Sequence, residues 1–191
     1  AGQGGQYVDM GRRLYDCHPV FRQSMDRCFS VLNPLLRFDL KEVLYPSAGD
    51  GGPSIDFNRP HVSLPVLFSV EYSLGQLLIH LGVRPRAVIG YSFGEYIAAC
   101  TAGIMSLDDA LAIIVRRGQL IGGTVEGRML SIPLPAADVL PMLEGTGAGL
   151  AIDNGPSCIV SGPAADIAQL ERELKDKRLM CMPVNVPHPL H

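Results

Sequence analysis

Gly90-Tyr91-Ser92-Phe93-Gly94-Glu95 is the stretch around which the rest of the chain is organised. It follows a short apolar run, Ala87-Val88-Ile89, and precedes residues 96–100, whose composition is typical of a helix. A strand, a sharp turn and a helix in this order indicate a nucleophile elbow, in which a serine occupies a strained turn and nearby glycines allow close packing. The pattern predicts that Ser92 is a nucleophile beside the amides of a helix N-terminus. The alternative is a serine that only caps the helix.

The composition is that of a globular protein with a sizeable core. The chain has 191 residues, of which 47% are hydrophobic and 18% charged, enough for one domain or one and a half. The net charge is −3 and there is no block of Lys and Arg, which argues against a nucleic-acid partner. No apolar run reaches about 18 residues, so we expect no membrane span.

Cysteine usage and the N-terminal sequence indicate a cytoplasmic protein. The 5 cysteines are scattered without a CxxC pair, which favours buried thiols in a reducing compartment over disulfides. The first residues carry neither the charged nor the apolar segment of a signal peptide. The chain begins without a methionine, on a glycine-rich turn, and we therefore expect it to be part of a longer polypeptide.

The first two thirds of the chain predict an α/β architecture. Residues 10–38 have helical spacing with breaks at Pro19 and Pro34, and a second apolar stripe runs from Pro65 in a first helical turn to Gly82. Ser106 is the expected N-cap of a further helix that reaches residue 121. Together with the strand before Ser92, this order predicts a short parallel sheet with its functional end at the carboxyl edge.

After residue 126 the pattern changes. Strands are expected at 129–132, 149–153, 157–160 and 178–184, and helices at 136–144 and 164–175. This βαββαβ order is the ferredoxin-like plan. We therefore expect a large α/β subdomain over residues 1–126, an inserted small subdomain over 127–187, and a return to the large subdomain at 188–191.

Six short motifs occur in the order of one known family. They are Gly2-Gln3-Gly4-Gly5-Gln6, similar to GQGSQ; Gly90 to Glu95, similar to GHSxGE; Arg117-Gly118, similar to an RG pair; Asn154-Gly155-Pro156, similar to NGP; Val160-Ser161-Gly162, similar to VSG; and His188-Pro189-Leu190-His191, similar to HAFH. Over its whole length the chain thus resembles the acyltransferase domains of type I polyketide synthases and the malonyl-CoA:acyl-carrier-protein transacylases. The resemblance implies a hydrolase-like core that extends beyond both ends of this chain.

The resemblance also implies how the site works. Ser92 would form an acyl ester and His191 would be its base, although His188 remains open as the base from the sequence alone. The backbone amides of Gln3 and Phe93 would bind the oxyanion. The reaction would move an extender unit from malonyl-CoA to the phosphopantetheine of an acyl carrier protein, without a permanently bound cofactor. A ketosynthase and other domains of the same polypeptide are the other partners expected.

Selection of the acyl group is expected to depend on a second set of residues. The guanidinium of Arg117 can hold a malonyl carboxylate through two parallel hydrogen bonds, and Arg116 beside it is the alternative. Leu190 stands where the family's phenylalanine excludes an α-methyl branch, which favours malonyl over methylmalonyl. Tyr91 replaces the family's histidine before the serine. His188 and Asn154 complete the expected substrate-binding set.

Three other interpretations of these residues remain open at this stage. A thioester hydrolase could use the same scaffold with water as the acceptor, and a docking module of a megasynthase could keep the fold without catalysis. A zinc site made from Cys181, His188 and His191 would need a fourth ligand, so we expect no metal.

Overall fold

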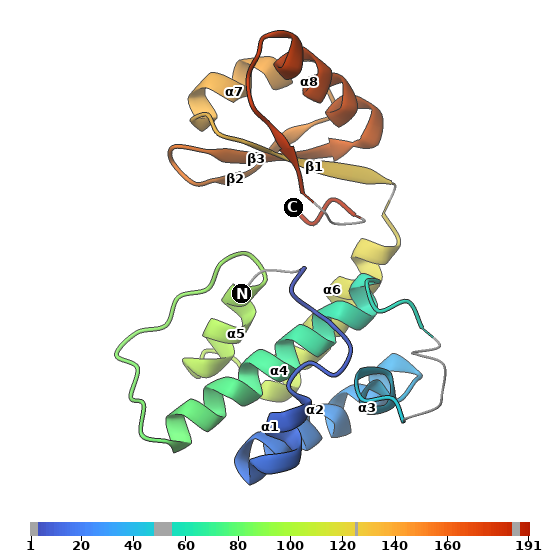
Figure 1. Cartoon of the computed structure of the whole chain (residues 1–191), viewed down its shortest axis with the longest axis vertical. Helices are drawn as coiled ribbons and strands as arrows, with labels where there is room; N and C mark the ends of the chain where they lie inside the picture. Colours follow the sequence, from blue (N-terminus) through green and yellow to red (C-terminus); the bar gives the residue numbers. More distant parts are fainter. Residues whose placement is uncertain (1–3, 48–54, 125, 185–187) are drawn as a thin grey trace. The chain divides into compact units, whose positions relative to one another are not determined.

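The chain divides into two units, Ala1–Gly122 and Gly123–His191. The computed structural model describes residues 4–47, 55–124, 126–184 and 188–191 (Figure 1). The first unit ends four residues before the predicted boundary at 126. Residues 188–191 belong to the second unit, whereas the sequence predicted their return to the first, and their place in a large subdomain stays a prediction.

Helices make up the regular structure in the described part of the first unit. They are α1 (Arg12–Cys17), α2 (Pro19–Leu36), α3 (Leu40–Leu44), α4 (Pro60–His80), α5 (Gly94–Thr101) and α6 (Leu107–Gly122). α4 packs against α2, α5 and α6, and its buried side chains fill the core of this unit (Figure 1).

The ends of these helices follow their proline and glycine signals, with two corrections. Pro19 begins α2 as predicted, but Pro34 does not break it, because the helix continues for two further residues to Leu36. α4 begins at Pro60 rather than near Pro65, since Pro60 already fits the first helical position. Gly82, with φ 100°, follows its C-terminus as expected.

The length and composition of α4 would allow it to cross a membrane. However, 61% of its most apolar window is buried inside the first unit, as in the core helix of a globular domain. The length and composition of a single helix are weak evidence for a membrane span.

The prediction of a parallel sheet in the first unit is wrong for the residues that the structure describes. Residues 87–89 form no strand, and every strand pair found among the described residues is antiparallel. A strand requires a neighbouring backbone to hydrogen-bond with, and the described part of the first unit offers none to this segment. Its apolar side chains are accordingly uncovered, with Ile89 94% exposed.

The second unit is a four-stranded antiparallel sheet with two helices. Its elements are β1 (Gly127–Ile132), α7 (Ala136–Leu143), β2 (Gly149–Asp153), β3 (Cys158–Pro163), α8 (Ala164–Asp176) and β4 (Met182–Pro183). The order of elements is the predicted one, and the strands lie in the order β2-β3-β1-β4. In the register of β1 and β3, Met129 faces Ser161 and Leu130 faces Val160.

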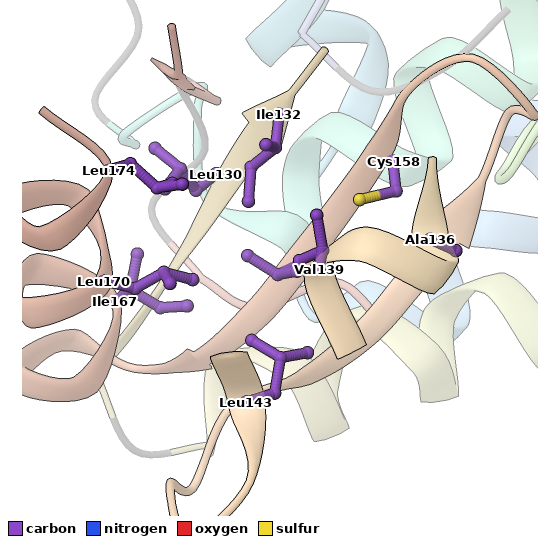
Figure 2. Packing of buried hydrophobic residues seen from close by; sticks show 10 residues of the cluster. Leu130, Ile132, Ala136, Val139, Leu143, Cys158, Ile167, Leu170 and Leu174 are labelled. Atoms are coloured by element: carbon purple, nitrogen blue, oxygen red, sulfur yellow. The ribbon is translucent and has the colours of Figure 1, made fainter. Parts of the chain in front are cut away.

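One face of this sheet packs against both helices. Figure 2 shows the side chains of this core, which come from β1, β3, α7 and α8. Leu130 and Val160 contribute from the strands, and Val139, Ile167 and Leu174 from the helices. Because side chains alternate along a strand, neighbours such as Met129 must lie on the opposite face.

Candidate active site

Ser92 has a strained backbone. Its φ is 51°, in the left-handed region that side chains other than glycine rarely adopt. Two short-range hydrogen bonds close the turn, from the Gly94 N–H to the Tyr91 carbonyl at 2.9 Å and from the Glu95 N–H to the Ser92 carbonyl at 3.2 Å. A non-glycine residue in this conformation costs about 1–3 kcal/mol and is concentrated at functional sites.

Gly90 allows the segment before the turn to approach the helix after it. A Cβ atom at position 90 would lie 2.2 Å from the Glu95 backbone nitrogen and 2.3 Å from the Gly94 carbonyl carbon. No side chain can occupy that space. The close approach expected from the glycine spacing is therefore present, and it holds Ser92 at the N-terminal end of α5.

Phe93 follows Ser92 and occupies the N-cap position of α5. Its side chain is only 2% exposed, which fixes this corner, while its backbone N–H belongs to the positive end of the helix. This geometry suits an oxyanion donor. Gln3, the second predicted donor, lies outside the described residues. Three residues later, Gln6 Nε2 donates to Asn58 Oδ1 at 3.2 Å, which joins the N-terminal residues to the segment before α4.

Arg117 contacts α5, the helix that follows Ser92. Its guanidinium carbon lies 5.6 Å from the ring centroid of Tyr96 on α5, and that ring lies 6.1 Å from the ring of Phe93. Gly118 brings α6 close to the start of α4, since a Cβ there would lie 2.8 Å from His61 Cα. The structure thus joins Arg117 to the elbow through Tyr96, a contact that sequence reasoning missed.

Arg116 and Arg117 differ in their surroundings. Both line a groove of about 500 Å³ together with Tyr96 and Leu120. Arg117 is half-buried, whereas Arg116 is exposed to solvent. The half-buried guanidinium is the better placed of the two for holding a desolvated carboxylate.

Tyr91 lies on another hollow beside the elbow. Its side chain is 49% exposed and lines a groove of about 450 Å³ with Gly90, Glu71 and Ile97. A role in binding the acyl group stays a prediction.

The C-terminal tetrapeptide packs on the first strand of the second unit. The Leu190 N–H donates to Met129 Sδ at 3.4 Å, and Pro189 lies so close to Gly127 that a Cβ there would be 2.7 Å from its Cγ. His188 is half-buried, and its Nδ1 has no hydrogen-bond partner among the residues that the structure describes. His191 is exposed.

Asn154 lies in the exposed turn between β2 and β3. Its N–H donates to the Ser157 carbonyl at 2.9 Å, and the next residue, Gly155, has φ 81° and donates its N–H to Asp153 Oδ1 at 2.8 Å. The turn by itself accounts for the Asn-Gly-Pro sequence. The expected role of Asn154 in substrate binding therefore remains a prediction.

The predicted site residues thus fall into two groups. Ser92, Phe93 and Arg117 belong to the first unit, while His188, Leu190 and His191 belong to the second. Pairing of Ser92 with His191 remains a prediction.

Two buried thiols of the first unit, Cys28 and Cys100, are poor nucleophiles at neutral pH. Burial raises the pKa of Cys100, on the same helix as the elbow, and raises that of Cys28 to about 12. Thiols with raised pKa values stay protonated and are poor nucleophiles. Over residues 4–47, 55–124, 126–184 and 188–191, no three His, Cys, Asp or Glu side chains gather in a way that could hold a metal ion.

Comparisons with known proteins show which family the chain belongs to. The sequence matches the acyl transferase domain family over residues 1–191. It is 35% identical over 190 residues to a phenolphthiocerol/phthiocerol polyketide synthase from Mycobacterium tuberculosis, covering 100% of this chain but only 12% of that relative.

Two solved structures are similar to this chain. The acyl transferase domain of ZmaA matches with a TM-score of 0.87 and 42% identity, over 99% of this chain and 45% of that one. The acyl transferase domain of SpnD, in complex with 2-(pent-4-yn-1-yl)malonyl, matches with a TM-score of 0.85 and 37% identity, over 98% and 44%. These matches confirm the resemblance found in the sequence: this chain belongs to the acyl transferase domain family, and its relatives are domains of polyketide synthases.

Proposed function

We propose that this chain transfers a malonyl-type extender unit from coenzyme A to the phosphopantetheine thiol of an acyl carrier protein, through an ester on Ser92. The observation that carries the proposal is the elbow, with Ser92 at φ 51° and Gly90 pressed against the Glu95 amide. A hydroxyl held clear of its own backbone at a helix N-terminus is suited to attack a carbonyl group.

The reaction then has two matching halves. The Ser92 hydroxyl attacks the thioester carbonyl of malonyl-CoA while His191 takes its proton, and the coenzyme A thiolate leaves with that proton. The carrier thiol next attacks the Ser92 ester, gives its proton to His191, and the Ser92 oxygen regains a proton as the ester bond breaks. In each half, the tetrahedral oxyanion accepts hydrogen bonds from the backbone amides of Phe93 and Gln3.

Selection of the acyl group is assigned to both units. Arg117 would bind the free carboxylate of malonyl, supported by its half-buried place beside Tyr96. Leu190 would crowd an α-methyl branch and so favour malonyl over methylmalonyl, with Tyr91, His188 and Asn154 around the acyl group. The solved relative that holds a substituted malonyl group supports a malonyl-type substrate.

The family context supplies the rest of the proposal. The strand order β2-β3-β1-β4 supports a ferredoxin-like small subdomain, and the elbow supports a hydrolase-like core around Ser92. Because the relatives are parts of much longer synthases, we propose that an acyl carrier protein, a ketosynthase and other domains are its partners in the cytoplasm.

Mass spectrometry of the full-length protein tests this function. After mixing with malonyl-CoA, we expect a malonyl adduct on the peptide that contains Ser92, and its discharge when a carrier protein bearing phosphopantetheine is added. Ser92→Ala is the control and should carry no adduct. An unmodified, folded wild-type protein would contradict the proposal and leave a docking module. Discharge at the same rate without carrier protein would identify a thioester hydrolase instead.

A further inference from the structure

The second face of the small sheet holds a buried methionine that the helices do not cover. Leu130 and Ile132 on β1 belong to the core formed with α7 and α8 (Figure 2). Met129 alternates with them and faces the other way, yet it is only 3% exposed.

Two later residues of the second unit donate hydrogen bonds to Met129, one to its side chain and one to its backbone. The Leu190 N–H donates to Met129 Sδ at 3.4 Å, and the Val184 N–H donates to the Met129 backbone carbonyl at 3.0 Å. Met129 therefore binds the chain shortly after β4 and again just before His191. One residue of β1 thus accepts hydrogen bonds from both Val184 and Leu190.

Gly127 makes the adjoining contact. It lies two residues from Met129 and so on the same face of β1. A Cβ at position 127 would lie 2.7 Å from Pro189 Cγ, 2.9 Å from Pro189 Cδ and 2.8 Å from the Gly162 carbonyl oxygen. The proline ring is rigid and cannot yield as a flexible side chain would, so any larger residue must displace the tetrapeptide or β3.

We propose that Gly127 and Met129 are positioning residues for His191, holding Pro189 and Leu190 so that the imidazole is presented at a fixed place. This inference rests on the proposed function, in which His191 is the base. His191 directly follows Pro189 and Leu190 in the chain, so a shift of their backbone also shifts His191. A shift of about 1 Å in a catalytic group can cost about 100-fold in rate.

The chain offers matched glycine variants for the test. Gly127→Ala introduces the clash with Pro189. Gly162→Ala disturbs the neighbouring strand without Pro189, since its Cβ would lie 2.7 Å from Ala148 Cα. Gly149→Ala, in β2, meets nothing within 4 Å and is the neutral control. In the full-length protein, we expect Gly127→Ala to lower kcat about 10–100-fold with an unchanged KM for malonyl-CoA.

The activity of each variant must be expressed per molecule that can form the Ser92 ester, so that misfolded protein does not count. The amplitude of the burst of coenzyme A release gives the concentration of sites that form the Ser92 ester. The maximal velocity divided by this concentration is kcat per competent site. Gly162→Ala should lower the melting temperature at least as much as Gly127→Ala while keeping kcat per competent site within about twofold of Gly149→Ala. If Gly127→Ala keeps the kcat of Gly149→Ala, or if Gly162→Ala loses as much, the proposal is wrong.

A double-mutant cycle isolates the contact. With Pro189→Ala already present, Gly127→Ala should cost less kcat than it does alone, because the clash with the Pro189 ring is gone and only that with the Gly162 carbonyl oxygen remains. Equal losses in both backgrounds would contradict the proposal. Met129→Leu keeps the volume but removes the sulfur acceptor, and we expect a loss in kcat of about twofold to fivefold, smaller because sulfur accepts hydrogen bonds weakly.

A spectroscopic arm separates this inference from the proposed function. Failure of the function would appear as a wild-type protein without a Ser92 adduct. The ring proton shifts of His188 and His191 in NMR spectra report the placement whether or not transfer occurs. They should change in Gly127→Ala and stay at wild-type values in Gly162→Ala and Gly149→Ala. Unchanged His191 shifts in Gly127→Ala would overturn the inference alone.

Discussion

The guanidinium carbon of Arg117 on α6 lies 5.6 Å from the centroid of the Tyr96 ring on α5. A cation over an aromatic face contributes about 0.5–2 kcal/mol and restricts the arginine to one side of the ring. Tyr96 lies four residues after Ser92, so the short helix that follows the proposed nucleophile also orients the proposed carboxylate-binding group.

Replacement of Arg117 should change which acyl group is accepted. Arg117→Ala is expected to cost about 1.5–3 kcal/mol in kcat/KM for malonyl-CoA, the contribution of a charged hydrogen bond, with little loss for acetyl-CoA. Arg116→Ala, next in sequence and exposed, is the control and should leave both values near wild type. An equal loss on both substrates would make Arg117 structural.

The strain at Ser92 should be measurable as stability. We expect Ser92→Gly to be more stable than Ser92→Ala by about 1 kcal/mol, because glycine adopts a positive φ without the clash of a Cβ. Ser30, inside α2, is the matched control: there Gly should be less stable than Ala by about 1 kcal/mol. Urea unfolding of the four variants measures these differences in the free energy of unfolding. The same sign at both positions would rule out backbone strain at Ser92.

Gly118 should couple helix packing to selectivity. Gly118→Ala places a Cβ 2.8 Å from His61 Cα and 2.8 Å from the Pro60 carbonyl oxygen, and we expect a loss of about 1–3 kcal/mol in stability. Because Arg117 is adjacent, preference for malonyl over acetyl should fall as well. Gly122→Ala in the same helix meets nothing within 4 Å and should be neutral or slightly stabilising. Thermal unfolding and paired substrate assays test both points, and identical behaviour of the two variants would contradict the packing role.

Alkaline pH should lower the free energy of unfolding of the first unit, because the unfolded state favours ionisation of the Cys28 thiol. Burial raises the pKa of this thiol from 9.0 to about 12 in the folded chain. Its contribution to stability is complete below pH 9 and is lost as pH rises toward 12, because the unfolded thiol ionises first. We expect Cys28→Ala to reduce the fall in unfolding free energy by up to about 1.4 kcal/mol per pH unit in that window.

Leu32→Ala is the control for this pH dependence. Leu32 lies one turn later on α2 and is also fully buried, so its loss should destabilise the fold without changing the slope against pH. Urea titrations at several pH values give the slopes. A Cys28→Ala slope equal to that of wild type would show that the thiol does not titrate in this range.

Local signals predicted much of the fold and part of the site. The turn at Ser92 and the strand at Gly149–Asp153 follow from residues close in sequence, and the structure has both. Residues 87–89 were expected to form a strand from their apolar character, but strand formation depends on a distant partner that a local pattern cannot supply.

The structure was needed to choose between nearby residues that fit the same sequence pattern. Helical periodicity hardly separates Arg116 from Arg117, whereas burial and the Tyr96 ring do. Pro65 resembled a helix start, but Pro60 satisfies the same preference five residues earlier. The contacts of Gly127 and Met129 with the tetrapeptide join positions about 60 residues apart, and nothing in either local sequence indicates them.

The chain passes from one unit to the other once, at Gly122 and Gly123. Within residues 1–191, a junction there keeps the proposed base His191 and the proposed selector Leu190 with the Gly127 and Met129 of the same parent. A junction placed after β1 would instead pair the Gly127 and Met129 of one parent with the tetrapeptide of another. Chimeras cut at the first position should therefore inherit their donor's histidine geometry intact, and those cut at the second should not.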